Sequence, residues 1–262
     1  SCAEPAAQAT EAQFELSAFD KVISFSYAVA HGISTCPGQT HLSYTYTPMR
    51  YAWREFDLDG LQKPASPALS VVFSPFRRWD AAAARVGRFA SVSGWIKDWV
   101  RRIYQRDSTV IYPPVEVERF TPQVERENYY ITVARLVAHK RVDLMVEAFN
   151  RLKLPLLVVG TGPERARLEQ RAGENIRFLG FQSDEQVSEL LSRARGYVCA
   201  GEEDFGIAMV EAQAAGCPVI AYGRGGALEI VTEAETGVFF AEQTVENLAE
   251  AMSRFDGMRF NP

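Results

Sequence analysis

The sequence predicts an α/β protein with parallel, doubly wound sheets, and two observations carry this prediction. Short apolar runs alternate with stretches of helical period throughout the second half of the chain. Alternating strands and helices are typical of a parallel sheet that is covered by helices on both faces. The Pro113–Pro114 pair opens a segment without clear period, which predicts a linker near residues 113–127. We therefore expect two domains, residues 1–118 and 119–262.

In the second domain, local signals support the expected elements. Ser183 with Gln186 three residues later predicts a capping box at a helix start, and Gly216 predicts a helix end. Pro163 is expected in the first turn of another helix. The strands are expected at residues 128–134, 155–160, 175–180, 197–200, 218–222 and 237–240. The helices are expected at residues 141–152, 163–172, 183–194, 206–216, 226–231 and 244–255.

The first half of the chain has a less regular pattern. Residues 55–75 have no clear period and are expected to form a mobile loop. The helix expected at residues 94–106 carries an apolar stripe on one face and basic side chains on the other. This period favours a core-facing helix, and a membrane-surface patch is the alternative. The strands of this half are expected at residues 21–26, 41–46, 88–93 and 109–113.

The composition bounds the class of protein. The chain has 262 residues, of which 47% are hydrophobic, and this suffices for one large or two small domains. A net charge of −5 argues against wholesale nucleic-acid binding. No apolar run reaches the roughly 18 residues that a membrane-spanning helix needs. The histidines are too scattered to suggest a metal site.

The positions of the cysteines favour a reducing compartment. Cys199 and Cys217 lie in apolar runs, which predicts buried thiols in a reducing, cytoplasmic compartment. The spacing of the 4 cysteines suggests neither a disulfide framework nor a zinc site.

Glycine-rich loops follow several of the predicted strands, at residues 160–163, 201–206 and 223–226. In doubly wound sheets ligands bind at the carboxyl ends of strands, where glycines and helix N–H groups suit phosphate. Glycine is also common in tight turns, but three such loops at one edge favour a nucleotide site that includes Gly160 and Gly162. Arg135 and Lys140 follow the first strand of this domain and fit either a diphosphate or a solvated basic loop.

Two carboxylates stand out near these loops. Glu202, Glu203 and Asp204 have an ordinary interpretation as acids in the first turn of a helix, where the dipole favours them. Glu211 lies in an otherwise small and apolar helical stretch. A carboxylate that faces a ligand there prefers hydroxyl donors, such as a vicinal diol of ribose or of a sugar, to phosphate oxygens. The bare spacing of Glu203 and Glu211 means little by itself.

A wider match goes beyond the two acids. The stretches EEDFGIAMVEAQAAGCPVIAYGRGGALEIVTEAETGVFF, ITVARLVAHKRVDLMVEAF and VIYPPVEVERFTP resemble the retaining glycosyltransferases of family 4, which have a GT-B fold. THLSYTYTPMRYAW and RRWDAAAARV are similar to the mannosyltransferase-like branch, which includes O-antigen and exopolysaccharide enzymes. The resemblance covers about residues 11–256. It implies two Rossmann-like domains, of which the N-terminal one is expected to be incomplete.

The resemblance implies a role for each matching residue. Glu211 would bind the hydroxyls of the donor ribose, and Glu203 would reach the hydroxyls of the donor sugar. Arg135 and Lys140 would neutralise the diphosphate leaving group. Backbone N–H groups would lie beside the sugar and phosphates at Phe205, Gly206 and Ile207. The implied reaction transfers a hexose, in this branch mannose from GDP-mannose, with retention of configuration and without a metal.

The acceptor side is expected in the N-terminal domain. Relatives often carry a histidine before TPMR, where this chain has Tyr46, and His41 and His31 are nearby alternatives. The acceptor-side candidates are Tyr46, His31 and Arg50. The implied acceptor is a saccharide or a polyprenyl-linked saccharide, and the implied location is the cytoplasm or the inner face of its membrane. Two rivals remain open, a nucleotide-sugar 2-epimerase of the same architecture and a non-catalytic nucleotide-sugar binding protein.

Overall fold

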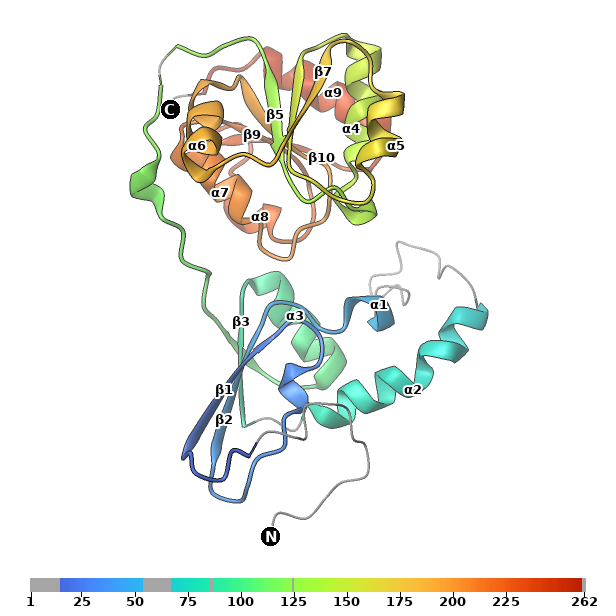
Figure 1. Ribbon diagram of the computed structural model, residues 1–262, viewed down its shortest axis with the longest axis vertical. Coiled ribbons are helices and arrows are strands. Elements are labelled where there is room, and N and C mark those ends of the chain that lie inside the picture. The colour runs from blue at the N-terminus through green and yellow to red at the C-terminus, as the bar shows by residue number, and fades with distance from the viewer. Residues whose placement is uncertain (1–14, 54–66, 85–86, 124, 261–262) are drawn as a thin grey trace. The chain divides into compact units, whose positions relative to one another are not determined.

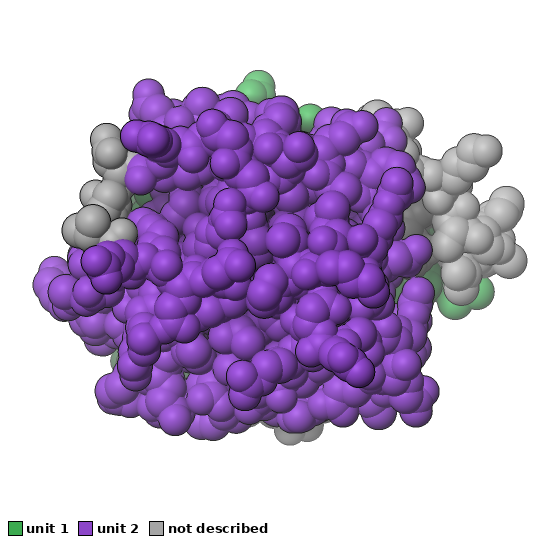
Figure 2. All heavy atoms as spheres, turned by 90° about the horizontal axis from the view of Figure 1, so that it is seen from above, with its two compact units in different colours: residues 1–112 green, residues 113–262 purple. Residues whose placement is uncertain are grey.

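The computed structural model describes residues 15–53, 67–84, 87–123 and 125–260 (Figure 1). The chain forms two compact units, Ser1–Tyr112 and Pro113–Pro262, which Figure 2 colours separately. We refer to them as unit 1 and unit 2. The linker segment expected near residues 113–127 opens unit 2.

Unit 2 is built on a parallel sheet with doubly wound strand order. Within the described residues, six strands pair in the order β10-β9-β8-β5-β6-β7, and every pair is parallel. The chain builds outward from β5 through β6 and β7, then returns to the other side of β5 for β8. The strands are β5 (Tyr130–Val133), β6 (Leu156–Val159), β7 (Ile176–Gly180), β8 (Gly196–Cys199), β9 (Val219–Tyr222) and β10 (Gly237–Phe240). All six lie where the sequence predicts them.

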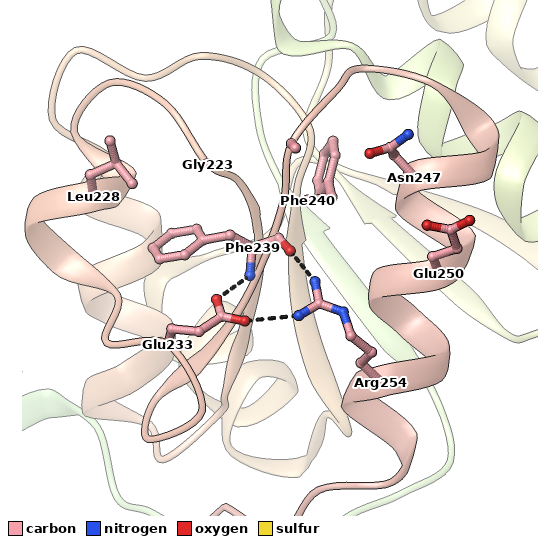
Figure 3. A pocket seen from close by; sticks show the side chains of 9 residues that line it. Gly223, Leu228, Glu233, Phe239, Phe240, Asn247, Glu250 and Arg254 are labelled. Atoms are coloured by element: carbon pink, nitrogen blue, oxygen red, sulfur yellow. Dashed lines mark hydrogen bonds and ion pairs between the residues drawn. The ribbon is translucent and has the colours of Figure 1, made fainter.

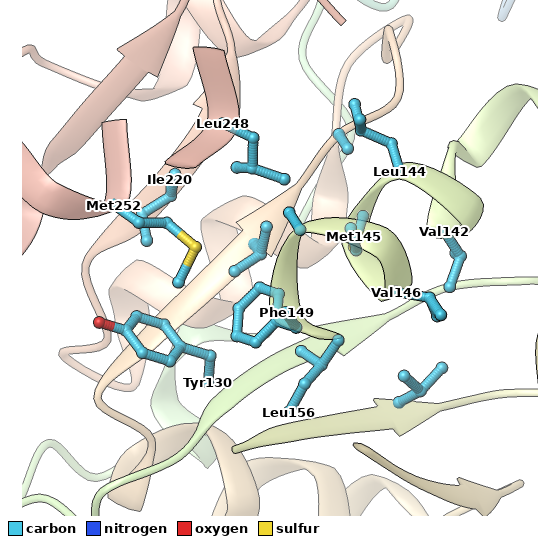
Figure 4. Close-up of a cluster of buried hydrophobic side chains, with 14 of the residues drawn as sticks. Tyr130, Val142, Leu144, Met145, Val146, Phe149, Leu156, Ile220, Leu248 and Met252 are labelled. Carbon is cyan, nitrogen blue, oxygen red and sulfur yellow. The ribbon is translucent and has the colours of Figure 1, made fainter. Parts of the chain in front are cut away.

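Helices cover both faces of this sheet because successive strand residues point to opposite sides. Tyr130 of β5 packs against Phe149 in the core shown in Figure 4. The Tyr130 ring also packs against Phe255. Its neighbour Ile131 is buried in the core of the opposite face, together with Met209. The first core is covered by α4 (Val142–Leu152), α5 (Arg165–Arg171) and α9 (Val245–Asp256), and the second by α6 (Asp184–Arg193), α7 (Ile207–Ala214) and α8 (Ala227–Ile230) (Figure 1).

Local caps set the helix boundaries of unit 2, with one difference from the sequence prediction. The Ser183 hydroxyl accepts from the Gln186 N–H, and the Gln186 side chain accepts from the Ser183 N–H, so the predicted capping box is confirmed. Gly216 follows α7 with a φ of 74°, a conformation that glycine adopts without strain. Pro163 does not lie in the first turn of α5, because that helix begins at Arg165.

Unit 1 is also a parallel sheet. Within the described residues, four strands pair in the order β1-β2-β3-β4, all parallel. The strands are β1 (Lys21–Ser26), β2 (Thr40–Thr45), β3 (Arg88–Ser91) and β4 (Ser108–Val110). The helices are the 3-10 turn η2 (Ala30–Gly32), α1 (Arg50–Trp53), α2 (Pro67–Ala83) and α3 (Gly94–Tyr104). The four predicted strands are confirmed, with β3 and β4 shorter than expected.

Helix α2 corrects one expectation. The sequence predicts a mobile loop over residues 55–75, but residues 67–75 belong to α2. Residues 54–66 lie outside the described residues. The expectation rests on the lack of a clear period, and the two prolines do not prevent a helix here. Pro67 occupies the first helical position, where no N–H is needed, and Pro75 is accommodated inside the helix.

Helix α3 packs its apolar stripe into unit 1. Ile96, Trp99, Val100 and Ile103 are all at most 8% exposed. The core-facing interpretation of this helix is therefore confirmed, and its basic side chains remain on the outer face. No helix in the described ranges is both long and apolar enough to cross a membrane.

The cysteines divide into two groups. Cys199 and Cys217 are buried free thiols, as the apolar runs around them predict. Burial raises the pKa of the Cys217 thiol to about 12, so this thiol stays protonated at neutral pH. Cys36 of unit 1 is disulfide-bonded, which the sequence does not predict.

Candidate functional site

Strands β5 and β8 are neighbours in the sheet of unit 2. From β5 the chain adds strands on one side, and from β8 it adds strands on the other side, so the strand order reverses between them. This position is the topological switch point of the sheet. In doubly wound sheets, ligands bind outside the carboxyl ends of the strands at such a switch point. The 3-10 turn η4 (Ala138–Lys140) follows β5, and residues 200–206 follow β8. The two loops touch, since a Cβ on Gly201 would lie 2.8 Å from the His139 carbonyl oxygen.

An ion pair joins these two loops. Lys140 Nζ lies 2.6 Å from each carboxylate oxygen of Glu203. The two side chains are 25% and 17% exposed, so they are partly shielded but still reachable by a ligand. Arg135, the other predicted cation, is exposed, and its side chain has no hydrogen bond or ion pair to any described residue.

The loop after β9 closes around the backbone of Glu203. The Gly226 N–H donates to the Glu203 carbonyl oxygen at 2.8 Å, and Gly225 pairs with Glu203 in a parallel bridge. Arg224 of this loop also places its Nε 2.9 Å from Glu202 Oε2, with both side chains at most 15% exposed. Glu202 therefore has a partner that the sequence did not reveal.

The acids of the 202–204 run do not lie in the first turn of a helix. Helix α7 begins at Ile207, and its first turn contains no acid. The interpretation of Glu202, Glu203 and Asp204 as first-turn acids is therefore wrong. Gly206 precedes the helix with a φ of 110° and offers no side-chain cap. Across the described part of the chain, nothing accepts from the N–H groups of Gly206 and Ile207, which suits an anion.

Glu211 lies in the second turn of α7 and contacts an arginine from the linker segment. Arg119 donates from Nη2 to Glu211 Oε1 and from Nη1 to Asp184 Oδ2, the latter at 2.9 Å. Burial raises the pKa of Glu211, and the Arg119 charge opposes that rise while Asp184 adds to it. Glu211 is therefore a half-buried acid whose carboxylate is paired with one cation, Arg119.

The two glycines after β6 are required by close backbone packing. A Cβ on Gly160 would collide with the carbonyl oxygen of Ala134, and one on Gly162 with that of Leu136. These two glycines let the loop after β6 pack directly on the loop after β5. Their contact with a donor remains a prediction.

The acceptor candidates lie in unit 1, after the carboxyl ends of β1 and β2. Tyr46 follows β2, is 38% exposed and packs edge-on against Tyr44 at 5.3 Å between ring centroids. Arg50 begins α1. His31 is only 1% exposed, and its ring nitrogens lie 3.2 Å from Ser26 Oγ and 3.2 Å from Asp80 Oδ1. Their predicted acceptor roles stay predictions.

A pocket of about 430 Å³ runs along the edge strand β10 of unit 2 (Figure 3). Gly223, from one of the predicted glycine-rich loops, lines it, but none of the charged residues predicted for the donor site does. Glu233 Oε2 accepts from the Phe239 N–H at 2.7 Å, and Arg254 donates to the Phe239 carbonyl oxygen. Arg254 Nη1 also lies 2.9 Å from Glu233 Oε1. This ion pair thus caps the outward backbone groups of Phe239. The pocket is lined by Gly223, Leu228, Glu233, Phe239, Phe240, Ala241, Asn247, Glu250 and Arg254.

The model of the family described as Glycosyl transferases group 1 matches residues 115–255, more than half of the chain. This chain belongs to that family. The matched range contains every residue predicted for the donor site, from Arg135 to Glu211.

Curated relatives of this group 1 glycosyl transferase chain include mannosyltransferases. The O-antigen chain mannosyltransferase RfbU of Salmonella typhimurium is 27% identical over 190 residues, which are 63% of this chain and 53% of the relative. A GDP-mannose-dependent alpha-(1-6)-phosphatidylinositol dimannoside mannosyltransferase of Mycobacterium tuberculosis is 29% identical over 189 residues, 65% of this chain and 49% of the relative. The chain therefore spans about half the length of these relatives.

Solved structures confirm the predicted GT-B fold. The sucrose-phosphate synthase of Thermosynechococcus elongatus aligns with a TM-score of 0.74 at 19% identity, over 92% of this chain and 65% of that chain. Anabaena HepE in complex with UDP and glucose aligns with a TM-score of 0.65 at 16% identity, over 82% of this chain and 61% of that chain.

Proposed function

We propose that this group 1 family member is a retaining, family 4-like hexosyltransferase that moves mannose from GDP-mannose to a saccharide or polyprenyl-linked acceptor. Three features support the proposal: the family, the mannosyltransferase names among its relatives, and the charge arrangement at the switch point of unit 2. The observation that carries the proposal is that Lys140 and Glu203 lie on opposite sides of that switch point. Helix α7 begins just after Glu203 in the chain, and no side chain caps its start.

Each group at this edge has a task in the proposed reaction. The bond from the anomeric carbon to the diphosphate oxygen breaks, and a bond to an acceptor hydroxyl oxygen forms on the same face of the sugar. The diphosphate leaves with the bonding electrons, and its departing oxygen takes up the proton that the acceptor hydroxyl loses. Lys140, Arg135 and the N–H groups at Gly206 and Ile207 stabilise the charge that develops on this leaving group.

The two acids bind the uncharged parts of the donor. Glu211 accepts hydrogen bonds from the ribose hydroxyls, and Glu203 accepts from hydroxyls of the transferred sugar. Glu203 shares its oxygens with Lys140, so donor binding places sugar hydroxyls beside an existing ion pair. The reaction uses cationic side chains in place of a metal.

Unit 1 supplies the acceptor side of the proposal. Tyr46 is the exposed candidate next to the carboxyl end of β2, with Arg50 nearby in sequence. A polyprenyl-linked acceptor would bring the protein to the cytoplasmic face of the membrane. Lys97 and Arg101 on the outer face of α3 are then the side chains proposed for membrane contact.

The experiment is donor consumption by the natural full-length protein. GDP-mannose, UDP-glucose and ADP-glucose are each incubated with a saccharide acceptor extract, and the anomeric configuration of the new linkage is read by NMR. We expect acceptor-dependent GDP release and an α-linked product that retains the donor configuration. Binding without turnover, or release of a free sugar epimer without acceptor, would instead indicate one of the two rival functions.

A further inference from the structure

Arg119 is fixed to unit 2 at both its backbone and its side chain. It ends the 3-10 turn η3 (Val117–Arg119), and its carbonyl oxygen accepts from Ser188 Oγ of α6 at 3.0 Å. Its guanidinium carbon lies 4.8 Å from the ring centroid of Phe120. Phe120 is 6% exposed and belongs to the core beneath α6 and α7. The arginine is therefore held in one place before any ligand arrives.

The guanidinium forks between two acids from different helices. Nη2 contacts Glu211 of α7, and Nη1 contacts Asp184, the first residue of α6. The Arg119 side chain is 27% exposed, Glu211 is 15% exposed and Asp184 is 77% exposed. Because the Glu211 contact is the more shielded, it carries more of the interaction than the contact with Asp184.

The two carboxylate oxygens of Glu211 are not equivalent. Oε1 accepts from Arg119, while no residue in the described ranges donates to Oε2. A single fixed contact from a planar fork restricts the rotation of the carboxylate about its terminal bond. Oε2 is thus held ready for a donor from outside the protein. Arg119 also opposes the rise in the pKa of Glu211 that burial causes.

We propose that Arg119 is a positioning residue for ribose recognition, which holds Glu211 by one oxygen and presents the other to the ligand. The inference rests on the proposed function, which assigns Glu211 to the ribose hydroxyls. Arg119 touches no ligand in this arrangement and acts through Glu211. Its loss should therefore remove discrimination by ribose hydroxyls and leave contacts with the diphosphate intact.

The test compares two probes, GDP and its 2′,3′-dideoxy analogue, by calorimetry at neutral pH. The unmodified protein should bind GDP roughly tenfold or more tightly than the analogue, as expected for hydrogen bonds to a charged group. We call the affinity for GDP divided by the affinity for the analogue the ratio. Arg119→Gln and Glu211→Gln should each bring this ratio close to one while leaving the affinity for the analogue unchanged. Arg119→Lys, which keeps the charge and loses the fork, should give an intermediate ratio.

A double variant and a matched control complete the design. Arg119→Gln combined with Glu211→Gln should match Glu211→Gln alone, since both changes remove the same interaction. Arg151→Gln breaks another arginine–glutamate pair, to Glu246 at 2.9 Å on the exposed surface of α4 and α9, and should leave the ratio unchanged. Thermal unfolding of each variant checks that the fold is retained.

The outcomes separate the inference from the proposed function. If Glu211→Gln keeps the full ratio, or the unmodified protein binds neither probe, the proposed function fails. If Glu211→Gln loses the ratio and Arg119→Gln and Arg119→Lys both keep it, the positioning role alone is overturned. Equal weakening of GDP and the analogue in folded Arg119→Gln also overturns it, because that result places Arg119 on the diphosphate.

Discussion

Lys140 Nζ is within 2.6 Å of both carboxylate oxygens of Glu203, and the two residues come from loops that follow the adjacent strands β5 and β8. The contact is symmetrical, so the ammonium lies between the two oxygens. One side chain of the pair is suited to an anion and the other to hydroxyl donors. Substitution of each residue in turn separates these two tasks.

Among the variants of the donor site, Lys140→Gln should reduce the rate of sugar transfer most. The substitution removes the cation proposed to stabilise the leaving diphosphate and leaves Glu203 without its partner. We expect kcat/KM to fall by about 100-fold or more, the range found when one electrostatic donor is removed from an active site. Steady-state transfer measures it, with Lys153→Gln at the exposed end of α4 as the control. A change of less than threefold would exclude the proposed role.

Glu203→Ala should impair transfer more than the binding of free GDP. Free GDP lacks the sugar hydroxyls that Glu203 is proposed to bind, and the freed Lys140 remains available to its phosphates. Calorimetry with GDP and transfer from GDP-mannose are compared on the same preparation. Glu250→Ala, at an exposed position of α9, serves as the control. Equal losses in both measurements would contradict the sugar-facing position of Glu203.

Glu211→Ala should weaken GDP binding by about 1–3 kcal/mol, the range for lost hydrogen bonds to a charged group. The same substitution should lower the thermal stability of unit 2, because Arg119 then keeps only the exposed Asp184 as a partner. Calorimetry and thermal unfolding check the two effects. Glu246→Ala, which breaks an exposed pair, should change neither by a comparable amount. An unchanged GDP affinity would remove Glu211 from the donor site.

Transfer should continue in excess chelator. Lys140 and Arg135 supply the positive charge that a divalent metal would otherwise provide to the leaving diphosphate. We expect the same rate after dialysis against EDTA as before it, with no gain from added magnesium or manganese. Loss of activity in EDTA that returns with one of these metals would refute the metal-free mechanism.

Unit 1 should lose stability as the pH falls below about 6.5. His41 is 4% exposed with Nε2 2.8 Å from Ser24 Oγ. Burial lowers its pKa, and nearby His31 adds to that shift. The unfolded chain therefore takes up a proton at a higher pH than the folded chain, so stability is complete above 6.5 and decreases as the pH falls toward the folded pKa.

Tryptophan fluorescence can isolate this effect, since all 4 tryptophans lie between residues 53 and 99. His41→Gln should flatten the pH dependence of unit 1 unfolding in that window. His139→Gln, an exposed histidine of unit 2, should leave it unchanged. The same slope in His41→Gln as in the unmodified protein would show that another group causes it.

Much of unit 2 could be predicted because its signals are local. Ser183 and Gln186 are three residues apart and form their capping box as expected. Parallel pairing of regularly spaced strands brings their carboxyl ends to one edge, so the loops holding Lys140 and Glu203 could be expected to meet. Neither inference needs a contact between particular distant side chains.

The partners of the acids could not be predicted in the same way. Arg119 and Glu211 are 92 residues apart in sequence, and nothing in the local pattern of either residue specifies the other. Arg224 likewise reaches Glu202 from the loop after the next strand. The linker motif VERF was part of the family resemblance, but its arginine carried no local signal of a partner. Such pairs depend on how the loops pack on one another. The spacing of hydrophobic residues along the chain does not specify this packing.

The ion pair between Glu233 and Arg254 has a consequence for how molecules of this protein meet. Strand β10 is the last strand of its sheet, and an open strand edge recruits strands from other chains. Here the pair occupies the outward N–H and carbonyl of Phe239, and Ala234 donates to the carbonyl of Gly237. A foreign strand would have to displace both before it could add to the sheet. The pair therefore opposes the addition of a foreign β-strand along this edge.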